Sequence, residues 1–239
     1  MTTTFSLSSF QTAIRTFDHI ALTGEARLAI RSNKMSILAS GLYVELALDK
    51  IGISSFPDCA FSYRDLFDLK RLLPAEGDAE IEATQGGVRF RDPDSRWNVF
   101  VKSYPLPEQS DSDIVLKPLL TNDCTAEFTG DTLAQTFDCV TAVGARYATL
   151  EIFENKLEII SASETFAAKF SVDSGTSNFN ENYSRIFQMV NIETIAALLR
   201  TCPTWTVSAN SETLDQLLFR DDNGVLSVVL SPMIEIPEF

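Results

Sequence analysis

Apolar residues recur every three or four positions in four segments of the chain, which is the spacing of one face of an amphipathic helix. The four predicted helices are 8–19, 64–73, 131–144 and 191–202. Ser8 and Gln11 match a capping box at the start of the first helix, and Asn191 matches the N-cap of the fourth. The apolar stripes are Phe10, Ala13, Ile14 and Phe17; Leu66, Leu69 and Leu73; Leu133, Phe137 and Val140; and Ile192, Ile195, Ala196 and Leu199.

Short runs that alternate apolar and polar residues, or are rich in β-branched residues, lie between these helices and predict β-strands. The predicted strands are 5–7, 26–31, 35–39, 43–48, 58–62, 79–83, 87–91 and 97–102 in the first half and 125–129, 147–154, 156–161, 165–172, 183–190, 205–209, 214–220 and 225–230 in the second. This mixture predicts an α+β fold with antiparallel sheets.

The two halves of the chain repeat one order of elements: strand, helix, about four strands, helix, three strands. Phe90-Arg91-Asp92 returns as Phe219-Arg220-Asp221, and each copy enters a turn followed by a β-rich run. The segment between the halves carries three prolines, a polar cluster and a short apolar island, the composition of a linker. We therefore predict one domain at 1–104, an interdomain connector at 105–124, and a second domain at 125–239 with a C-terminal tail.

Charge and composition exclude several function classes. The 239 residues carry a net charge of −14, which argues against ordinary nucleic-acid binding through clusters of Lys and Arg. The single His argues against a Ser-His-Asp triad or a His-rich metal site. The four cysteines form no CxxC pair and predict reduced thiols rather than disulfides or zinc ligands. No apolar run approaches the ~20 residues of a membrane helix, so we expect no membrane association.

Two short motifs resemble ligand sites, but turn geometry explains each of them better. Gln85-Gly86-Gly87 is followed by a strand and no Lys-Ser/Thr, which favours a hairpin turn over a phosphate loop. Residues 221–224 carry acidic side chains, yet Asn223-Gly224 is typical of a hairpin turn rather than a calcium loop. His19 is interpreted as a surface residue or helix C-cap. We predict no catalytic residue, no metal and no cofactor.

The tandem order of elements, the acidic composition and the placement of the connector resemble the DNA sliding clamps. The similarity is to the two-domain, trimer-forming clamps of the T4-type phage and proliferating-cell-nuclear-antigen families, and it covers nearly the whole chain. It implies two tandem clamp domains per chain, with helices on one face of antiparallel sheets, and three chains in a closed ring. Such a ring encircles duplex DNA and tethers a DNA polymerase for processive replication. It is not an enzyme and is opened by a clamp loader.

The resemblance also implies two sets of functional residues. Helices of the family line a central hole, so the basic residues on the outward helix faces would lie near DNA. These DNA-facing candidates are Arg15, Arg64, Lys70, Arg71, Arg146 and Arg200. Polymerase and clamp-loader peptides of the family dock in an apolar groove between the domains. The matching groove residues are Leu42, Tyr43, Ile114, Val115, Leu116, Leu119, Val229, Leu230 and Pro232.

Ring closure in the family implies that strand 97–102 pairs with strand 165–172 of a neighbouring chain. A cytoplasmic location follows, in the host cell if a phage encodes the chain. Two alternatives stay open at this point. One is a duplicated α+β enzyme or ligand-binding protein with a pocket between its halves. The other is a clamp relative that serves as a scaffold without binding DNA, because acidic residues also lie on the predicted helix faces.

Overall fold

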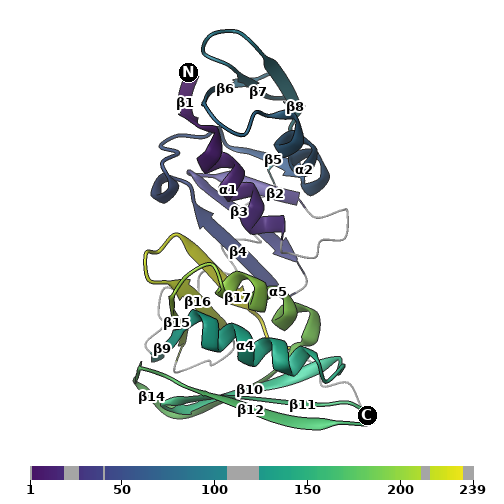
Figure 1. Cartoon of the computed structure of the whole chain (residues 1–239), viewed down its shortest axis with the longest axis vertical. Helices are drawn as coiled ribbons and strands as arrows, with labels where there is room; N and C mark the ends of the chain where they lie inside the picture. The colour runs from purple at the N-terminus through teal and green to yellow at the C-terminus, as the bar shows by residue number, and fades with distance from the viewer. Residues whose placement is uncertain (1, 19–26, 40, 107–123, 211–215, 234–239) are drawn as a thin grey trace. The chain divides into compact units, whose positions relative to one another are not determined.

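The computed structural model describes residues 2–18, 27–39, 41–106, 124–210 and 216–233, and it confirms an α+β fold with antiparallel sheets. The chain divides into two compact units (Figure 1). Unit 1 comprises Met1–Ala39, Val44–Asp111 and Gly224–Leu226, and unit 2 comprises Ser40–Tyr43, Ser112–Asn223 and Ser227–Phe239. No helix among the described residues is both long enough and apolar enough to span a membrane.

Unit 1 contains two helices and two antiparallel sheets among its described residues. Its elements in chain order are β1 (Thr2–Ser6), α1 (Leu7–Asp18), β2 (Arg27–Arg31), β3 (Lys34–Ala39), β4 (Leu42–Ala47, whose first two residues group with unit 2), the 3-10 helix η1 (Asp49–Ile51), β5 (Cys59–Ser62), α2 (Tyr63–Leu72), β6 (Asp78–Thr84), β7 (Gly87–Arg91) and β8 (Asn98–Lys102). One sheet has the order β1-β6-β7-β8, and the other runs β5-β2-β3-β4. β8 is therefore an edge strand.

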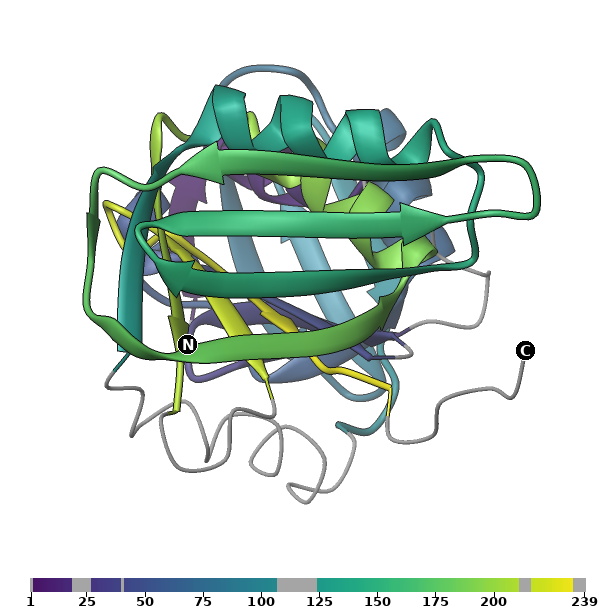
Figure 2. The same cartoon turned by 90° about the horizontal axis from the view of Figure 1, so that it is seen from below.

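Unit 2 repeats this arrangement. Its elements are β9 (Cys124–Thr129), α4 (Gly130–Thr141), β10 (Tyr147–Glu154), β11 (Lys156–Ala162), β12 (Ala167–Asp173), β13 (Thr176–Ser177), β14 (Phe179–Gln188), α5 (Met189–Leu199), β15 (Thr204–Ala209), β16 (Leu217–Asp221) and β17 (Leu226–Leu230). One sheet has the order β14-β10-β11-β12, and β9-β15-β16-β17 are neighbours in the other. Figure 2 shows the first of these sheets face-on, with β12 and β14 at its edges.

The repeat is therefore element by element, which confirms two tandem copies of one domain. α1 and α2 correspond to α4 and α5, β1 to β5 correspond to β9 to β12 and β14, and β6 to β8 correspond to β15 to β17. The Phe-Arg-Asp copies occupy equivalent places, at the ends of β7 and β16. In both copies the Phe and the Asp are buried while the Arg is exposed. The short β13 has no counterpart in unit 1.

The core of unit 1 is a cluster of four phenylalanines. Phe10 of α1 stacks on Phe56 with ring centroids 5.6 Å apart, and it also contacts Phe5 and Phe90 at 5.5 and 5.4 Å. All four side chains are buried. Tilted and edge-on aromatic contacts at these distances add to the free energy gained by burying the rings. The cluster fixes α1 against β1 and β7.

The core of unit 2 is built around Trp205, which is fully buried and donates a hydrogen bond from Nε1 to the carbonyl of Leu199, at the end of α5. Gly130, at the start of α4, approaches the same loop so closely that a Cβ there would lie 2.1 Å from the carbonyl oxygen of Cys202. Only glycine fits at such a contact. Trp205 and Gly130 thereby hold the two helices of unit 2 at fixed positions relative to β15.

The predicted caps of two helices are wrong. α1 begins at Leu7, so Ser8 lies inside the helix, and the side chain of Gln11 donates to the carbonyl of Pro74 instead of the helix start. α5 begins at Met189 with Gln188 as its N-cap, and Asn191 is buried within the helix. In both cases a buried residue, Leu7 or Met189, precedes the polar residue, so burial moves the helix start toward the N-terminus.

Several strand predictions are wrong at their ends. Met189 and Val190, predicted at the end of strand 183–190, belong to α5, and the predicted strand 165–172 begins only at Ala167. Residues 173–182, which lie between two predicted strands and outside both, contain β13 and the first residues of β14. Leu7, predicted at the end of the first strand, belongs to α1. His19 and most of the predicted connector, residues 107–123, lie outside the described residues.

Candidate nucleic-acid interface and partner groove

α1 presents a narrow polar face on unit 1. Its apolar side is buried through Phe10, Ile14 and Phe17, whereas Thr12 and Arg15 are exposed. The spacing of the buried residues is that of one helix stripe, and Arg15 lies opposite to it. The structure thus places the predicted Arg15 on the outward face of α1.

α2 presents the most basic face among the described helices. The helix begins after Ser62, whose Oγ accepts a hydrogen bond from the backbone N–H of Asp65 at 3.0 Å. Arg64, Asp68 and Arg71 are exposed and follow one another at spacings of four and three residues, so they share one face. No ion pair that the structure describes involves Arg15, Arg64 or Arg71.

Lys70 is the exception among the predicted cations of unit 1, because it forms an ion pair with Asp18 at the end of α1. Its Nζ also lies 5.7 Å from the ring centroid of Phe67, within the range of a cation–π contact. Both side chains of the ion pair are mostly buried. Lys70 therefore joins α1 to α2, and its charge is largely compensated within the unit.

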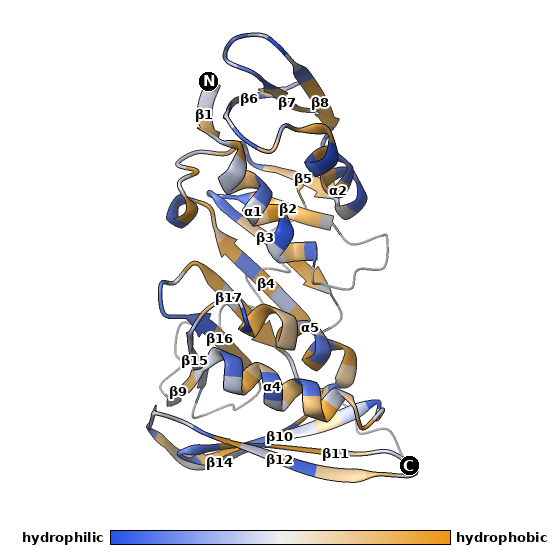
Figure 3. Ribbon diagram, in the orientation of Figure 1, coloured by the Kyte–Doolittle hydropathy of each residue, from blue (hydrophilic) through white to orange (hydrophobic). Residues whose placement is uncertain are grey.

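The helices of unit 2 carry the opposite charge. α4 contributes Asp131 and Asp138, α5 contributes Glu193, and neither helix contains a basic residue. Arg200, the C-cap of α5, forms an ion pair with Asp138 across the two helices. Arg146 follows α4 and is exposed. Hydropathy differs as well: Figure 3 shows that α2 is more hydrophilic than α5.

The six predicted DNA-facing residues are therefore divided between the units. Arg15, Arg64, Lys70 and Arg71 come together on the two helices of unit 1, and Arg146 and Arg200 lie at the helices of unit 2. All are exposed except Lys70, which is partly buried. The sequence showed the acidic residues on these faces but not which of them pair with the cations.

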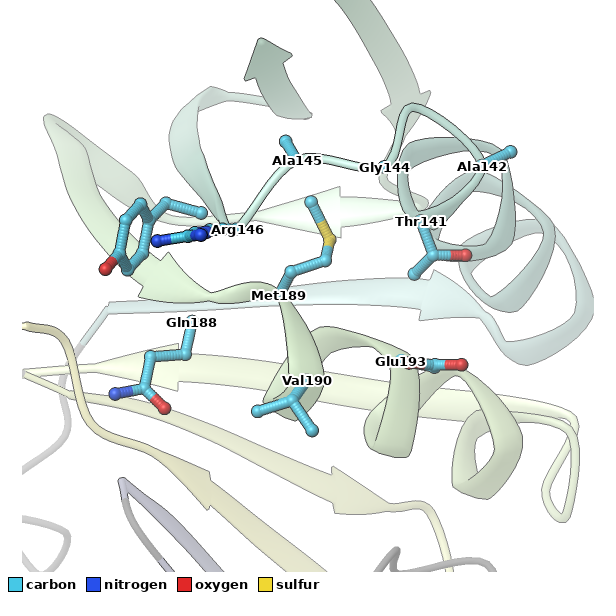
Figure 4. Close-up of a pocket in the computed structure, with 10 residues that line it drawn as sticks. Thr141, Ala142, Gly144, Ala145, Arg146, Gln188, Met189, Val190 and Glu193 are labelled. Atoms are coloured by element: carbon cyan, nitrogen blue, oxygen red, sulfur yellow. The ribbon is translucent and has the colours of Figure 1, made fainter. Parts of the chain in front are cut away.

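Arg146 lines an open depression in unit 2, between the end of α4 and the start of α5 (Figure 4). Its volume is about 570 Å³, and its lining combines small residues with Met189, Val190 and Glu193. Arg146 and Glu193 both line it, one before β10 and the other on α5. Buried polar groups that converge on one point are typical of a small-molecule site, and the exposed side chains of this depression do not form such a set.

The described members of the predicted partner groove lie in unit 2. Tyr43 packs with Val229 and with Leu218, a residue that the sequence reasoning missed. Leu42 and Leu230 are buried as well, and Pro232 is half-buried. The connector members of the groove lie outside the described residues; they are Ile114, Val115, Leu116 and Leu119. Leu218 stands in the apolar run Leu217-Leu218-Phe219 of β16, and all three residues are buried. A short continuous apolar run is the sequence signal of a strand buried on both faces, and it could have identified Leu218.

Cys202, Asp221 and Asp222 bring three metal-ligand atoms close together in unit 2. The Cys202 thiol donates to Oδ1 of Asp222 at 2.9 Å, and burial together with this hydrogen bond raises the pKa of the thiol. A thiol binds a metal as the thiolate. The thiol of Cys202 donates its proton in the hydrogen bond to Asp222. We therefore interpret the three residues as a hydrogen-bonded link between the α5–β15 loop and the turn after β16.

Comparison with solved structures places the fold among the sliding clamps, although no protein-family model and no curated protein matches the chain. A DNA polymerase III beta subunit assigned in Eubacterium rectale superposes with a TM-score of 0.78 at 13% identity, covering 98% of this chain and 66% of that one. The DNA polymerase sliding clamp of Pseudomonas aeruginosa gives 0.74 at 16% identity, covering 97% and 66%. Proliferating cellular nuclear antigen from Entamoeba histolytica gives 0.71 at 11% identity, covering 98% of both chains.

The chain thus spans about two-thirds of the length of the bacterial clamps and nearly the whole length of the Entamoeba protein. At these identities the likeness shows the fold. It agrees with the element-by-element repeat of units 1 and 2.

Proposed function

We propose that this chain, which has the sliding-clamp fold, encircles duplex DNA and tethers a DNA polymerase during replication. The observation that carries the proposal is the duplicated unit, which superposes on clamps of bacterial and eukaryotic origin over at least 97% of the chain. The proposed role is topological and non-enzymatic. A ring needs no strong phosphate attraction to stay on DNA, which is compatible with a net charge of −14.

The proposed assembly is a ring of three chains. Nearly full coverage of both chains in the match to the Entamoeba protein supports two units per chain, and the family resemblance implies six units per ring. Three chains of 26.5 kDa give a particle of about 80 kDa. The proposal also implies a location with the replicating DNA, in the cytoplasm of a bacterial or phage-infected cell.

Two sheet edges support this assembly. β8 ends one sheet of unit 1, and β12 ends one sheet of unit 2. By the internal repeat, β8 corresponds to β17 and β12 corresponds to β4. Backbone hydrogen bonds join residues next to β17 with residues at the ends of β4. The N–H of Ser231 donates to the carbonyl of Gly41, and the N–H of Ala47 donates to the carbonyl of Val225. We propose that β8 pairs in the same way with β12 of the next chain, which removes both exposed edges.

The edge pairing can be tested at Phe100, whose side chain is 53% exposed on β8. The N–H of Ser103 donates to Gly86 on the β7 side, so by alternation the N–H of Phe100 points away from β7. Phe100→Pro removes this donor, whereas the matched variant Phe100→Ala keeps it. Light scattering should give about 80 kDa for the wild type and Phe100→Ala and a single-chain mass for Phe100→Pro. A monomeric wild type at all concentrations would contradict the ring.

Encirclement itself can be tested without a clamp loader. The wild-type chain is mixed with a linear duplex, and both DNA ends are then blocked with streptavidin. We expect the protein to stay on blocked DNA through a wash at high salt and to be lost from DNA with free ends. Direct phosphate contacts weaken steeply with salt, but a threaded ring is held regardless of salt. Retention that does not depend on the ends would contradict a topological mode of binding.

The second proposed site is a docking groove for polymerase and clamp-loader peptides. It comprises Leu42, Tyr43, Ile114, Val115, Leu116, Leu119, Val229, Leu230 and Pro232. The support is the packing of Tyr43 with Val229 and the half-buried Pro232 beside them, together with the apolar composition of the connector. Apolar grooves of this kind bind short peptides through a few anchoring side chains.

The groove is tested by replacing Ile114 and Leu116 with Ser and measuring binding of a polymerase-derived peptide by fluorescence anisotropy. We expect the affinity to fall at least tenfold while the particle mass stays unchanged. Val190→Ser, an exposed apolar residue on α5, is the matched control and should bind normally. Unchanged peptide affinity in the double variant would remove this site from the proposal.

A further inference from the structure

We infer that the helices of unit 1 alone make the phosphate contacts of this clamp, and that the helices of unit 2 face the duplex without binding it. The inference rests on the proposed encirclement of DNA and names which half of the helix surface touches the backbone. Around a ring of three chains, basic sectors would then alternate with acidic ones.

The first observation is the distribution of helix charges. α1 and α2 contain four basic and three acidic residues, whereas α4 and α5 contain three acidic residues and no basic one. A phosphate backbone is attracted by the first surface and repelled by the second. Both helix pairs occupy equivalent places in the repeated topology, so the difference lies in the side chains.

The second observation is which cations are already compensated. In unit 1, Lys70 is paired with Asp18, but Arg15, Arg64 and Arg71 take part in no ion pair within the described residues. In unit 2, Arg200 is paired with Asp138. Of the basic residues on these four helices and at the C-cap of α5, three are in no described ion pair and can bind phosphate without breaking one. They are Arg15, Arg64 and Arg71, all on the helices of unit 1.

Arg146 is the one remaining candidate in unit 2 among the described residues. It is exposed and takes part in no ion pair that the structure describes, but it follows α4 instead of lying on a helix face. It shares the depression at the ends of α4 and α5 with the carboxylate of Glu193. A phosphate that entered this depression would meet an acidic as well as a basic lining residue, so the depression favours phosphate less than the exposed face of α2 that carries Arg64 and Arg71.

Arg71 and Arg146 make a matched pair for the test, because each is exposed and neither takes part in an ion pair with a residue that the structure describes. Each is replaced by Gln in the full chain, and binding to a fluorescein-labelled 30-base-pair duplex is followed by anisotropy between 50 and 200 mM KCl. The binding constant K falls as the salt concentration rises, and each lost phosphate contact reduces the steepness of log K against log salt by about 0.9. We expect this change for Arg71→Gln and no change for Arg146→Gln.

The triple variant Arg15→Gln, Arg64→Gln, Arg71→Gln should lose most of the salt dependence of duplex binding while retaining its particle mass and melting temperature. A purely structural role of these arginines would change the melting temperature and leave the salt slope in place. Equal slopes for the Arg71 and Arg146 variants would overturn the inference and leave the clamp proposal standing. A wild type that is not retained on end-blocked DNA would overturn both.

Discussion

The α1–α2 pair of unit 1 and the α4–α5 pair of unit 2 hold the same positions in one repeated topology, yet their outer faces differ in charge and in polarity. α2 exposes Arg64, Asp68 and Arg71 within ten residues. α5 buries eight of its eleven residues and exposes mainly Val190 and Glu193. α2 therefore has a solvated outer face that could bind a partner, whereas α5 is mostly a core helix.

This difference shows which positions the fold constrains. The inward residues of the two copies match in kind, as Phe90 and Phe219 do, because a change of volume in a packed core costs several kcal/mol. Outward residues away from specific contacts can change at a cost within about 0.5 kcal/mol. One duplicated backbone can therefore carry a basic surface on one copy and an acidic surface on the other.

The largest expected effect tests whether the cores of the two units lose the same amount of unfolding free energy when one buried ring is removed. Phe10→Ala in unit 1 and Phe137→Ala in unit 2 should each lower the free energy of unfolding by about 3–5 kcal/mol, since both rings are fully buried. Phe100→Ala, at an exposed edge position, is the control and should cost less than about 1 kcal/mol. Urea denaturation followed by tryptophan fluorescence and circular dichroism measures all three.

A marked difference between Phe10→Ala and Phe137→Ala would break the equivalence of the two cores. Phe10 contacts three other phenylalanines, whereas Phe137 has one described ring partner, Phe219, at 6.2 Å. Loss of several ring contacts would place Phe10→Ala at the upper end of the range. A cost below about 1 kcal/mol at either site would contradict its place in the core.

The second expected effect is a loss of stability at alkaline pH through a buried thiol of unit 1. Burial, and to a lesser extent the charge of Asp58, raises the pKa of the Cys59 thiol from 9.0 to about 12. Because the folded-state pKa lies above the unfolded one, the contribution of this group to stability is complete below pH 9 and is lost as the pH rises toward 12. The slope is about 1.4 kcal/mol per pH unit in that window.

Cys59→Ala should therefore flatten the fall in unfolding free energy between pH 9 and 11 relative to the wild type. Urea titrations at half-unit pH steps give the unfolding free energy of both proteins. Subtraction of one profile from the other cancels the contribution of the tyrosines and lysines, which both proteins share. Cys139→Ala is the control, because that thiol is exposed. Parallel profiles for the wild type and Cys59→Ala would show that Cys59 ionises as freely in the folded state as in the unfolded one.

The residue pattern predicted the helices and most strands, because both depend on short-range periodicity, and the repeated order of these elements predicted the duplication. The inward stripe of α1, from Phe10 to Phe17, and the end of α2 before Pro74 follow directly from local sequence. The start of α5 did not, because the tertiary burial of Met189 outweighs the capping preference of Asn191. Local propensities thus fail where long-range packing competes with them.

The division of the candidate DNA-facing residues could not be predicted in the same way. Lys70 and Asp18 are 52 positions apart, and Arg200 and Asp138 are 62 positions apart. Sequence periodicity places each charge on an outward face, but it carries no information on which helix lies beside which. The packing of the helices decides that two of the six predicted cations, Lys70 and Arg200, are compensated. It also decides that the arginines without an ion pair among the described residues lie mainly on the helices of unit 1.

The compensated cations offer a way to sharpen the contrast between the units. Asp138→Asn releases Arg200 and removes a negative charge from the helices of unit 2, and Asp18→Asn does the same for Lys70 in unit 1. Each variant gains at most one phosphate contact per chain, so duplex affinity should rise, and the rise should be larger at low salt than at high salt. Fluorescence anisotropy with the labelled duplex measures this rise.

The two releases are not equivalent. Arg200 is about half exposed, whereas Lys70 is largely buried and held near the ring of Phe67. Release of Arg200 should therefore give the larger gain in duplex affinity. Weaker binding in Asp138→Asn than in the wild type would contradict the electrostatic account of the unit 2 surface.

The smallest expected effect is the contribution of these ion pairs to stability. The side chains of Lys70 and Asp18 are 20% and 23% exposed, and those of Arg200 and Asp138 are 46% and 47% exposed. Exposed ion pairs contribute about 0.2–1 kcal/mol, because water and salt screen the attraction. A double-mutant cycle with Ala at both members of each pair should give a coupling energy near the upper limit for Lys70–Asp18 and near the lower limit for Arg200–Asp138.

Addition of 0.5 M KCl should reduce the coupling energy of Arg200–Asp138 more than that of Lys70–Asp18. The reverse order would mean that solvent exposure does not set the strength of these bridges, and that the cations of unit 2 are held as firmly as the Lys70 bridge of unit 1.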